Sequence, residues 1–133
     1  MVTVLLVDDF VDALEVWTLF LSAAGFTVAT AANGLAGLQQ ARTLRPDAIV
    51  LDLQMPGLSG PDLARALRAD ETTRHIPLIA ATGFTRGHEA EARAAGVDSI
   101  VHKPCDPDAL VAEIRRLVSA RPAMSATATP DRA

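Results

Sequence analysis

The feature that most constrains the fold of this chain is a short apolar run that ends abruptly in a carboxylate. Residues 48–51 read Ala-Ile-Val-Leu, Asp52 follows at once, and Pro56 and Gly57 close the segment. A continuous apolar run of this length between turn residues is typical of a strand buried on both faces of a parallel sheet. We therefore expect Asp52 at the carboxyl end of that strand, which is the edge where open α/β sheets bind ligands.

The same pattern opens the chain, where Val4-Leu5-Leu6-Val7 runs directly into Asp8 and Asp9. Strand-like segments alternate five times with segments whose apolar residues have helical spacing. Strands are expected at residues 2–7, 27–31, 48–52, 77–81 and 99–102, and helices at 11–24, 33–45, 59–70, 87–95 and from 106 onward. This alternation predicts an α/β fold, a doubly wound sheet of five parallel strands with five helices on its two faces.

Composition bounds the class of protein. With 133 residues, half of them hydrophobic and 21% charged, one globular domain over residues 1–120 is expected. Residues 121–133 are small and polar without a period, which predicts a disordered C-terminal tail. A net charge of −4 argues against direct nucleic-acid binding. No apolar run approaches the roughly 18 residues of a membrane span, and the start lacks the features of a signal peptide, so a cytoplasmic location is expected.

The predicted strand ends bring chemically active residues to one edge of the sheet: Asp8, Asp9, Asp52, Thr82 and Lys103. Three crowded carboxylates repel one another and call for a cation, and a site rich in oxygen suits Mg²⁺. With a cation nearby, Asp52 can remain ionised and attack a phosphoryl group. A hydroxyl on Thr82 and an ammonium group on Lys103 match the charge that develops on phosphoryl oxygens.

In these motifs the chain resembles the receiver domains of bacterial two-component response regulators, and its organisation is similar to that of the single-domain chemotaxis regulator. The residues that carry the resemblance are Asp8-Asp9, the segment Asp52-Leu53-Gln54-Met55-Pro56-Gly57, Thr82, and Lys103-Pro104. The resemblance covers residues 2–120. The resemblance implies a flavodoxin-like sheet with the strand order 2-1-3-4-5 and a role in phosphorylation-dependent signalling.

The resemblance also implies a role for each residue. Asp52 is the expected phosphoacceptor, receiving its phosphoryl group from a phosphohistidine on a sensor histidine kinase or a histidine phosphotransfer protein. The expected Mg²⁺ ligands are Asp9, Asp52 and the backbone carbonyl of Gln54, with Asp8 holding the water shell of the ion. Thr82 and Lys103 are expected to contact the phosphoryl group. The phosphorylated state would then be read by a downstream protein partner, with no enzymatic activity beyond self-phosphorylation and autodephosphorylation.

Two alternatives and one departure accompany this interpretation. A phosphatase of the haloacid-dehalogenase type also uses an Asp nucleophile and Mg²⁺, but it expects a second Asp where this chain has Gln54. An interaction module that does not depend on phosphorylation is the other alternative, against which the intact acid set argues. The departure is Ile100, which stands where the family usually has Tyr or Phe three residues before the Lys.

The predicted first helix carries more apolar residues than one buried face requires. Leu14, Trp17 and Leu21 share the face that must cover the sheet, whereas Val16 and Leu19 fall nearly opposite. The exposed set is either scattered apolar residues, which are normal on protein surfaces, or a docking face for a helical partner.

Overall fold

The computed structural model describes residues 2–55, 57–82, 89–102 and 106–120. Strands and helices alternate along it: β1 (Thr3–Val7), α1 (Val11–Ala23), β2 (Thr27–Ala31), α2 (Gly34–Leu44), β3 (Ala48–Asp52), α3 (Gly60–Ala69), β4 (Leu78–Thr82), α4 (Glu89–Ala94), β5 (Ser99–His102) and α5 (Pro107–Ser119). The strands form one parallel sheet in the order β2-β1-β3-β4-β5. The predicted fold class and strand order are confirmed. The expected tail at 121–133 lies outside the described residues.

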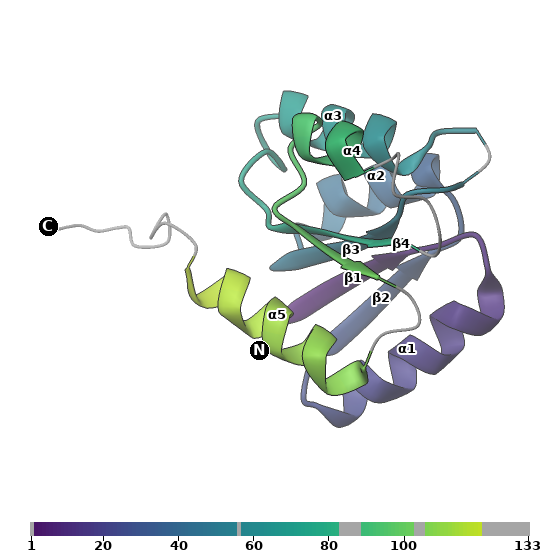
Figure 1. Ribbon diagram of the computed structural model, residues 1–133, viewed down its shortest axis with the longest axis vertical. Coiled ribbons are helices and arrows are strands. Elements are labelled where there is room, and N and C mark those ends of the chain that lie inside the picture. Colours follow the sequence, from purple (N-terminus) through teal and green to yellow (C-terminus); the bar gives the residue numbers. More distant parts are fainter. Residues whose placement is uncertain (1, 56, 83–88, 103–105, 121–133) are drawn as a thin grey trace, which may run out of the picture.

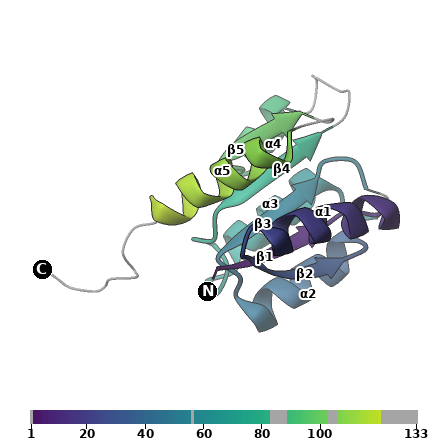
Figure 2. The same ribbon diagram turned by 90° about the horizontal axis from the view of Figure 1, so that it is seen from below.

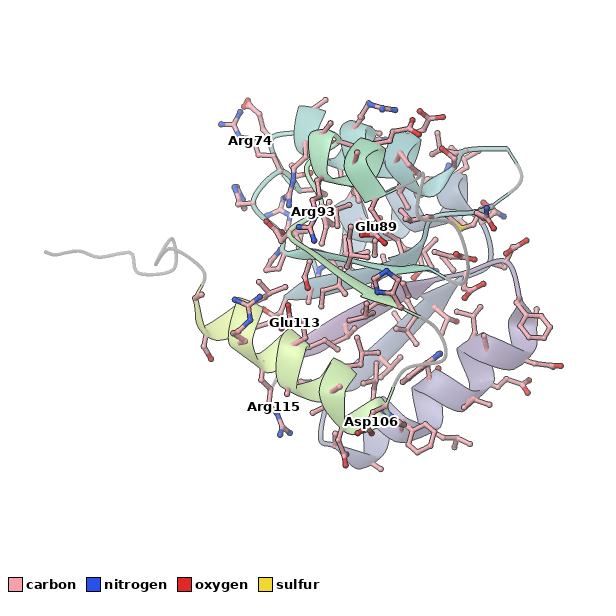
Figure 3. All side chains as sticks on the ribbon, in the orientation of Figure 1. Arg74, Glu89, Arg93, Asp106, Glu113 and Arg115 are labelled. Carbon is pink, nitrogen blue, oxygen red and sulfur yellow. The ribbon has the colours of Figure 1, made fainter. Side chains whose placement is uncertain are left out.

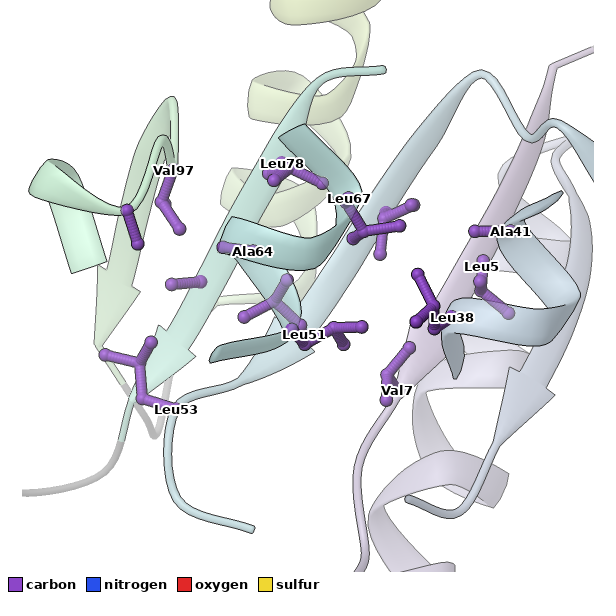
Figure 4. Close-up of a cluster of buried hydrophobic side chains, with 14 of the residues drawn as sticks. Leu5, Val7, Leu38, Ala41, Leu51, Leu53, Ala64, Leu67, Leu78 and Val97 are labelled. Atoms are coloured by element: carbon purple, nitrogen blue, oxygen red, sulfur yellow. The ribbon is translucent and has the colours of Figure 1, made fainter. Parts of the chain in front are cut away.

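The sheet separates two layers of helices. Helices α2, α3 and α4 cover one face, and α1 and α5 cover the other (Figures 1 and 2). Each face has its own apolar core. Leu5, Leu51, Leu67 and Leu78 contribute to the first core (Figure 4), whereas Leu21 and Ile114 contribute to the second. Because β1 and β3 send alternate side chains into both layers, residues 4–7 of β1 and 48–51 of β3 are apolar throughout.

Side-chain caps fix where three helices begin. The side chain of Asn33 accepts a hydrogen bond from the amide of Ala36 at 2.8 Å, which caps α2. The hydroxyl of Ser59 accepts one from the amide of Asp62 at 3.3 Å at the start of α3. Asp106 caps α5 in the same manner. These contacts satisfy amides that the first turn of a helix leaves without a backbone partner.

The helical faces follow the spacing of the apolar residues. Leu14 and Leu21 of α1 are buried, while Val16 is exposed and the side chain of Leu19 is 73% exposed. Strict three-residue spacing in α2 drifts around a helix of 3.6 residues per turn. Leu38 is accordingly buried, but Leu35 and Leu44 at the ends of that row are exposed.

The register of the strands aligns their carboxyl ends. Val7 of β1 pairs with Leu51 of β3, so that the residues that follow them, Asp8 and Asp52, emerge at the same level. Asp52 in turn pairs with Ala81, and Thr82 at the end of β4 pairs with His102. Strand β4 spans Leu78–Thr82, one residue later than the segment 77–81 expected from the sequence. Within the described residues, no helix has the length and apolar character needed to cross a bilayer.

Candidate functional site

Three carboxylates meet at the carboxyl edge of the sheet. Asp8, Asp9 and Asp52 each offer an oxygen, and these three oxygens all lie within 4.8 Å of one another. Asp8 is buried, Asp52 is partly buried and Asp9 is exposed, so the cluster opens to solvent on one side. Like charges this close repel one another, and carboxylate oxygens are the ligands that hard divalent ions prefer. The donor set therefore fits a divalent cation.

Local hydrogen bonds orient two of these carboxylates. An oxygen of Asp8 accepts a hydrogen bond from the backbone amide of Phe10 at 2.9 Å, and the amide of Asp8 donates to the carbonyl of Ala31 at 3.1 Å. These contacts tie Asp8 both to the start of α1 and to the end of β2. An oxygen of Asp52 accepts from the backbone amide of Gln54 at 3.2 Å. The orientation of the Asp52 carboxylate is thus coupled to the backbone two residues further along.

Thr82 and Lys103, the other side chains that the sequence assigns to the site, come at the ends of β4 and β5 in the sequence. Thr82 is the last residue of β4, on the strand that adjoins Asp52. Lys103 follows the end of β5 in the sequence but lies outside the described residues. Ile100, at the position that is usually aromatic, is partly buried and packs against the core beneath α3 and α4. The structure thus brings the three predicted acids together and leaves the position of the predicted lysine undescribed.

Sequence reasoning missed the glycines that support the loop between β3 and α3. A Cβ atom on Gly60 would lie 2.6 Å from Cα of Leu53 and closer still to the carbonyl oxygen of Asp52. A Cβ atom on Gly34, at the start of α2, would lie 2.5 Å from the carbonyl oxygen of Leu58. In the sequence, Gly60 is part of a helix-start signal, and nothing local marks it as a neighbour of Asp52.

Two carboxyl groups with strongly lowered pKa values belong to structural contacts away from the acid cluster. Hydrogen bonds from Thr72, together with Arg42, lower the pKa of Asp70 at the end of α3 to about 2. Glu113 lies on α5 (Figure 3). Hydrogen bonds from Arg116 and then from Ser99 lower the pKa of Glu113 to about 2. Both groups are ionised throughout the neutral range. Asp70 links the end of α3 to Arg42 of α2, and Glu113 links α5 to Ser99 of β5.

Comparison with known proteins identifies the class. Residues 4–115 match the model of the response regulator receiver domain, and the chain belongs to this family. Receiver domains are the signalling modules of two-component systems. The chain is therefore not a member of the haloacid-dehalogenase phosphatases. Its family agrees with the order of acids and strands described above.

Named relatives show how the match is distributed. The chain is 35% identical over 103 residues to the polar-differentiation response regulator DivK of Brucella anthropi, an alignment that covers 77% of this chain and 84% of DivK. It is 36% identical over 113 residues to the DNA-binding response regulator MtrA of Mycobacterium tuberculosis, covering 84% of this chain and 48% of MtrA. The chain therefore spans about half the length of MtrA.

Among solved structures, a similar one is the receiver domain of the sensor histidine kinase PA1611 from Pseudomonas aeruginosa. It has a TM-score of 0.84 and 29% sequence identity, and the alignment covers 89% of this chain and 98% of that domain. That structure is described as having a magnesium ion coordinated in its active-site cleft.

Proposed function

We propose that Asp52 is the phosphoacceptor of this receiver domain and that Asp8 and Asp9 hold the Mg²⁺ ion that supports the transfer. The observation that carries the proposal is the meeting of the three carboxylates within 4.8 Å at the carboxyl edge of the sheet. Asp52 and Asp9, with the backbone carbonyl of Gln54, would ligate the ion directly, and Asp8 would hold its water shell. The magnesium ion in the cleft of the PA1611 receiver supports this choice of metal.

The chemistry is an in-line transfer of a phosphoryl group. A carboxylate oxygen of Asp52 attacks the phosphorus of a phosphohistidine, the new O–P bond forms as the P–N bond breaks, and the imidazole leaves and takes up a proton. When bound, Mg²⁺ neutralises charge on the transferred oxygens. Thr82 and Lys103 would contact the remaining phosphoryl oxygens, by a hydroxyl donor and a positive charge respectively. A downstream protein partner would then distinguish the acyl phosphate from the free carboxylate.

The direct test is incubation with acetyl phosphate and Mg²⁺ followed by mass spectrometry of the intact protein. The wild type should gain one phosphoryl group, and Asp52→Ala should gain none. Asp62→Ala is the matched control, because Asp62 is an exposed carboxylate on α3 that forms an ion pair with Arg65. Retention of the adduct in Asp52→Ala would place the phosphoryl group elsewhere and overturn the assignment.

The exposed face of α1 is the surface that we propose for docking the phosphohistidine donor. Val16, Leu19 and Phe20 are large apolar residues that remain exposed on this helix. The helix is acidic as well as apolar, with Asp12 and Glu15, and the sequence has no Lys, Arg or His before Arg42. A helical donor surface that combines apolar residues with Lys or Arg would complement this face.

The docking proposal is tested separately from the chemistry. Leu19→Asp should slow transfer from a phosphorylated histidine kinase or phosphotransfer protein, because it places a charge in an apolar contact, but it should leave phosphorylation by acetyl phosphate unchanged. Leu44→Asp on α2 is the control, since Leu44 is also exposed but belongs to a helix on the other face of the sheet. Equal donor transfer by both variants would rule out the α1 face.

A further inference from the structure

The loop that follows Asp52 is fitted against the start of α3 without any intervening side chain. Gly60 is the first residue of α3, and a Cβ atom there would come within 2.6 Å of Cα of Leu53 and even nearer to the carbonyl oxygen of Asp52. Both neighbours are backbone atoms, which cannot rotate away as the end of a flexible side chain can. Any residue other than glycine must therefore displace either α3 or the Asp52–Leu53 peptide.

We infer that Gly60 is a positioning residue for the phosphoacceptor: by letting α3 contact the Asp52–Leu53 peptide directly, it holds the Asp52 carboxylate and the Gln54 backbone in the geometry of the metal site. This inference rests on the function proposed above for Asp52. It concerns a residue that touches neither the phosphoryl group nor the metal. Its influence passes through the backbone of the loop.

Hydrogen bonds show how a shift at Gly60 reaches the site. The amide of Gly60 donates to the carbonyl of Leu53 at 3.2 Å, which closes the loop between these two residues. At the other end of the same backbone segment, the amide of Gln54 donates to the carboxylate of Asp52 at 3.2 Å. Displacement of the Asp52–Leu53 peptide therefore moves the hydrogen-bond donor that orients the carboxylate, together with the carbonyl proposed as a metal ligand.

Buried side chains prevent the loop from absorbing that displacement. Leu53 and Met55 are buried in the core beneath α3, and Leu58 packs against the same core. Because close-packed interiors do not deform smoothly, a Cβ atom at position 60 cannot be accommodated by a diffuse rearrangement of the loop. The strain falls on the peptide next to Asp52 or on the start of α3, which the Ser59 cap holds in place.

A second glycine in the same loop environment provides a matched control. Gly34 is the first residue of α2, and a Cβ atom there would also meet a backbone carbonyl, that of Leu58, at 2.5 Å. Gly34→Ala and Gly60→Ala are thus the same substitution, each at the start of a helix and each against a carbonyl of the same loop. They differ in that only position 60 contacts the peptide of Asp52.

The experiment compares both variants with the wild type for unfolding free energy, Mg²⁺ affinity by calorimetry, and phosphorylation rate with acetyl phosphate. Both substitutions should lower stability. Only Gly60→Ala should weaken Mg²⁺ binding by the folded protein, by about tenfold, as for other residues that orient metal ligands. The phosphorylation rate of Gly60→Ala should fall by a similar factor or more, because misplacement of a reacting group is costly.

The outcomes separate this inference from the proposed function. If Gly60→Ala is unstable, all three proteins are measured in the same stabilising osmolyte, which favours the compact state. Unchanged Mg²⁺ affinity in folded Gly60→Ala, an equal loss in Gly34→Ala, or failure of Gly60→Ala to fold even with osmolyte would each reduce Gly60 to a purely structural role. Those results leave the assignment of Asp52 intact, since that assignment fails only if Asp52→Ala still accepts the phosphoryl group.

Discussion

The guanidinium group of Arg68 on α3 donates two hydrogen bonds to the carbonyl oxygen of Gly96, at 3.0 and 2.8 Å, beyond the end of α4. It also donates to the carbonyls of Arg74 and Ile76 and pairs with Asp98 at 2.8 Å. One side chain therefore satisfies carbonyl groups in two separate connecting segments. It lies at the amino edge of the sheet, opposite the acid cluster, where β4 and β5 begin.

Removal of Arg68 should destabilise the fold far more than removal of a neighbouring arginine. Arg68→Ala removes the donor to two partly buried carbonyls, those of Gly96 and Ile76, and a loss of about 3 kcal/mol in unfolding free energy is expected. Arg65→Ala on the same helix removes only exposed ion pairs and should cost less than about 1 kcal/mol. Denaturant titration of the two variants checks this, and equal losses would contradict the role given to Arg68.

The apolar pattern of α1 gives a second matched pair. Leu21 is completely buried and Leu19 is 73% exposed, although both are leucines on one helix. Leu21→Ala should lower the unfolding free energy by about 2–5 kcal/mol through lost burial and a residual cavity. Leu19→Ala should change it by no more than about 0.5 kcal/mol. Thermal or chemical denaturation distinguishes the two, and a large loss at Leu19 would mean that its side chain is covered in solution.

Because three carboxylates are crowded together, replacing one of them with an uncharged residue should stabilise the fold. Without divalent cations, Asp52→Asn should raise the unfolding free energy by about 1 kcal/mol, because it removes like-charge repulsion within the cluster. Saturating Mg²⁺ should stabilise the wild type by about 2.7 kcal/mol at a hundredfold excess over its dissociation constant, and the variant by less. The measurement is a denaturation series with chelator and with Mg²⁺.

Asp62→Asn serves as the control for that series. Asp62 pairs with Arg65 and not with another acid, so its neutralisation should bring no gain in stability. A wild type that Mg²⁺ does not stabilise, or an Asp52→Asn protein that is less stable in chelator, would contradict the proposed cation site.

Glu113 should make a pH-dependent contribution to stability. Its pKa falls from 4.5 to about 2 in the folded protein, because Arg116 and Ser99 hydrogen-bond its ionised form. A lowered pKa in the folded state means that the contribution is fully present above about pH 4.5 and is lost as the pH falls through about 2. Asp70, whose pKa is lowered from 3.8 to about 2, acts in the same direction.

The measurement is the denaturation midpoint at about pH 6 and about pH 3, for the wild type and for Glu113→Gln. The difference in stability between the two proteins should narrow at about pH 3, because Glu113 is then protonated in the unfolded chain but still ionised in the folded protein, so folding must release a proton. A difference that stays constant between these pH values would show that the hydrogen bonds do not favour the ionised carboxylate.

Most of the fold could be predicted from the sequence because the signals for it are local. A few consecutive residues are enough to show the apolar runs of β1 and β3 and the capping residues Asn33 and Ser59. The same holds for the change between strand-like and helix-like spacing of apolar residues. Strand ends depend on pairing with neighbouring strands, and β4 accordingly begins and ends one residue later than expected.

The meeting of the acids was also predictable, because parallel strands place their carboxyl ends at one edge. The positions of Asp8, Asp9 and Asp52 directly after apolar runs were enough to bring them together. The contribution of Arg68 was not predictable, since its partners are carbonyl groups that any sequence possesses. Their positions follow from how α3 packs against the two connecting segments.

By itself, the sequence determined the order of strands and helices, the strand ends that carry the acids, and the excess of apolar residues on α1. Only the tertiary structure decided which backbone segments touch, and so which glycines have no room for a side chain. In the sequence, Gly57 belongs to a turn and Gly60 to the start of a helix, and neither shows what surrounds it. A Cβ atom on Gly57 would meet nothing within 4 Å, whereas one on Gly60 would meet the backbone of Asp52 and Leu53. The difference arises because the room for a side chain depends on how segments distant in the sequence pack together. The preference for glycine in a local motif reflects only the conformation of the backbone at that position.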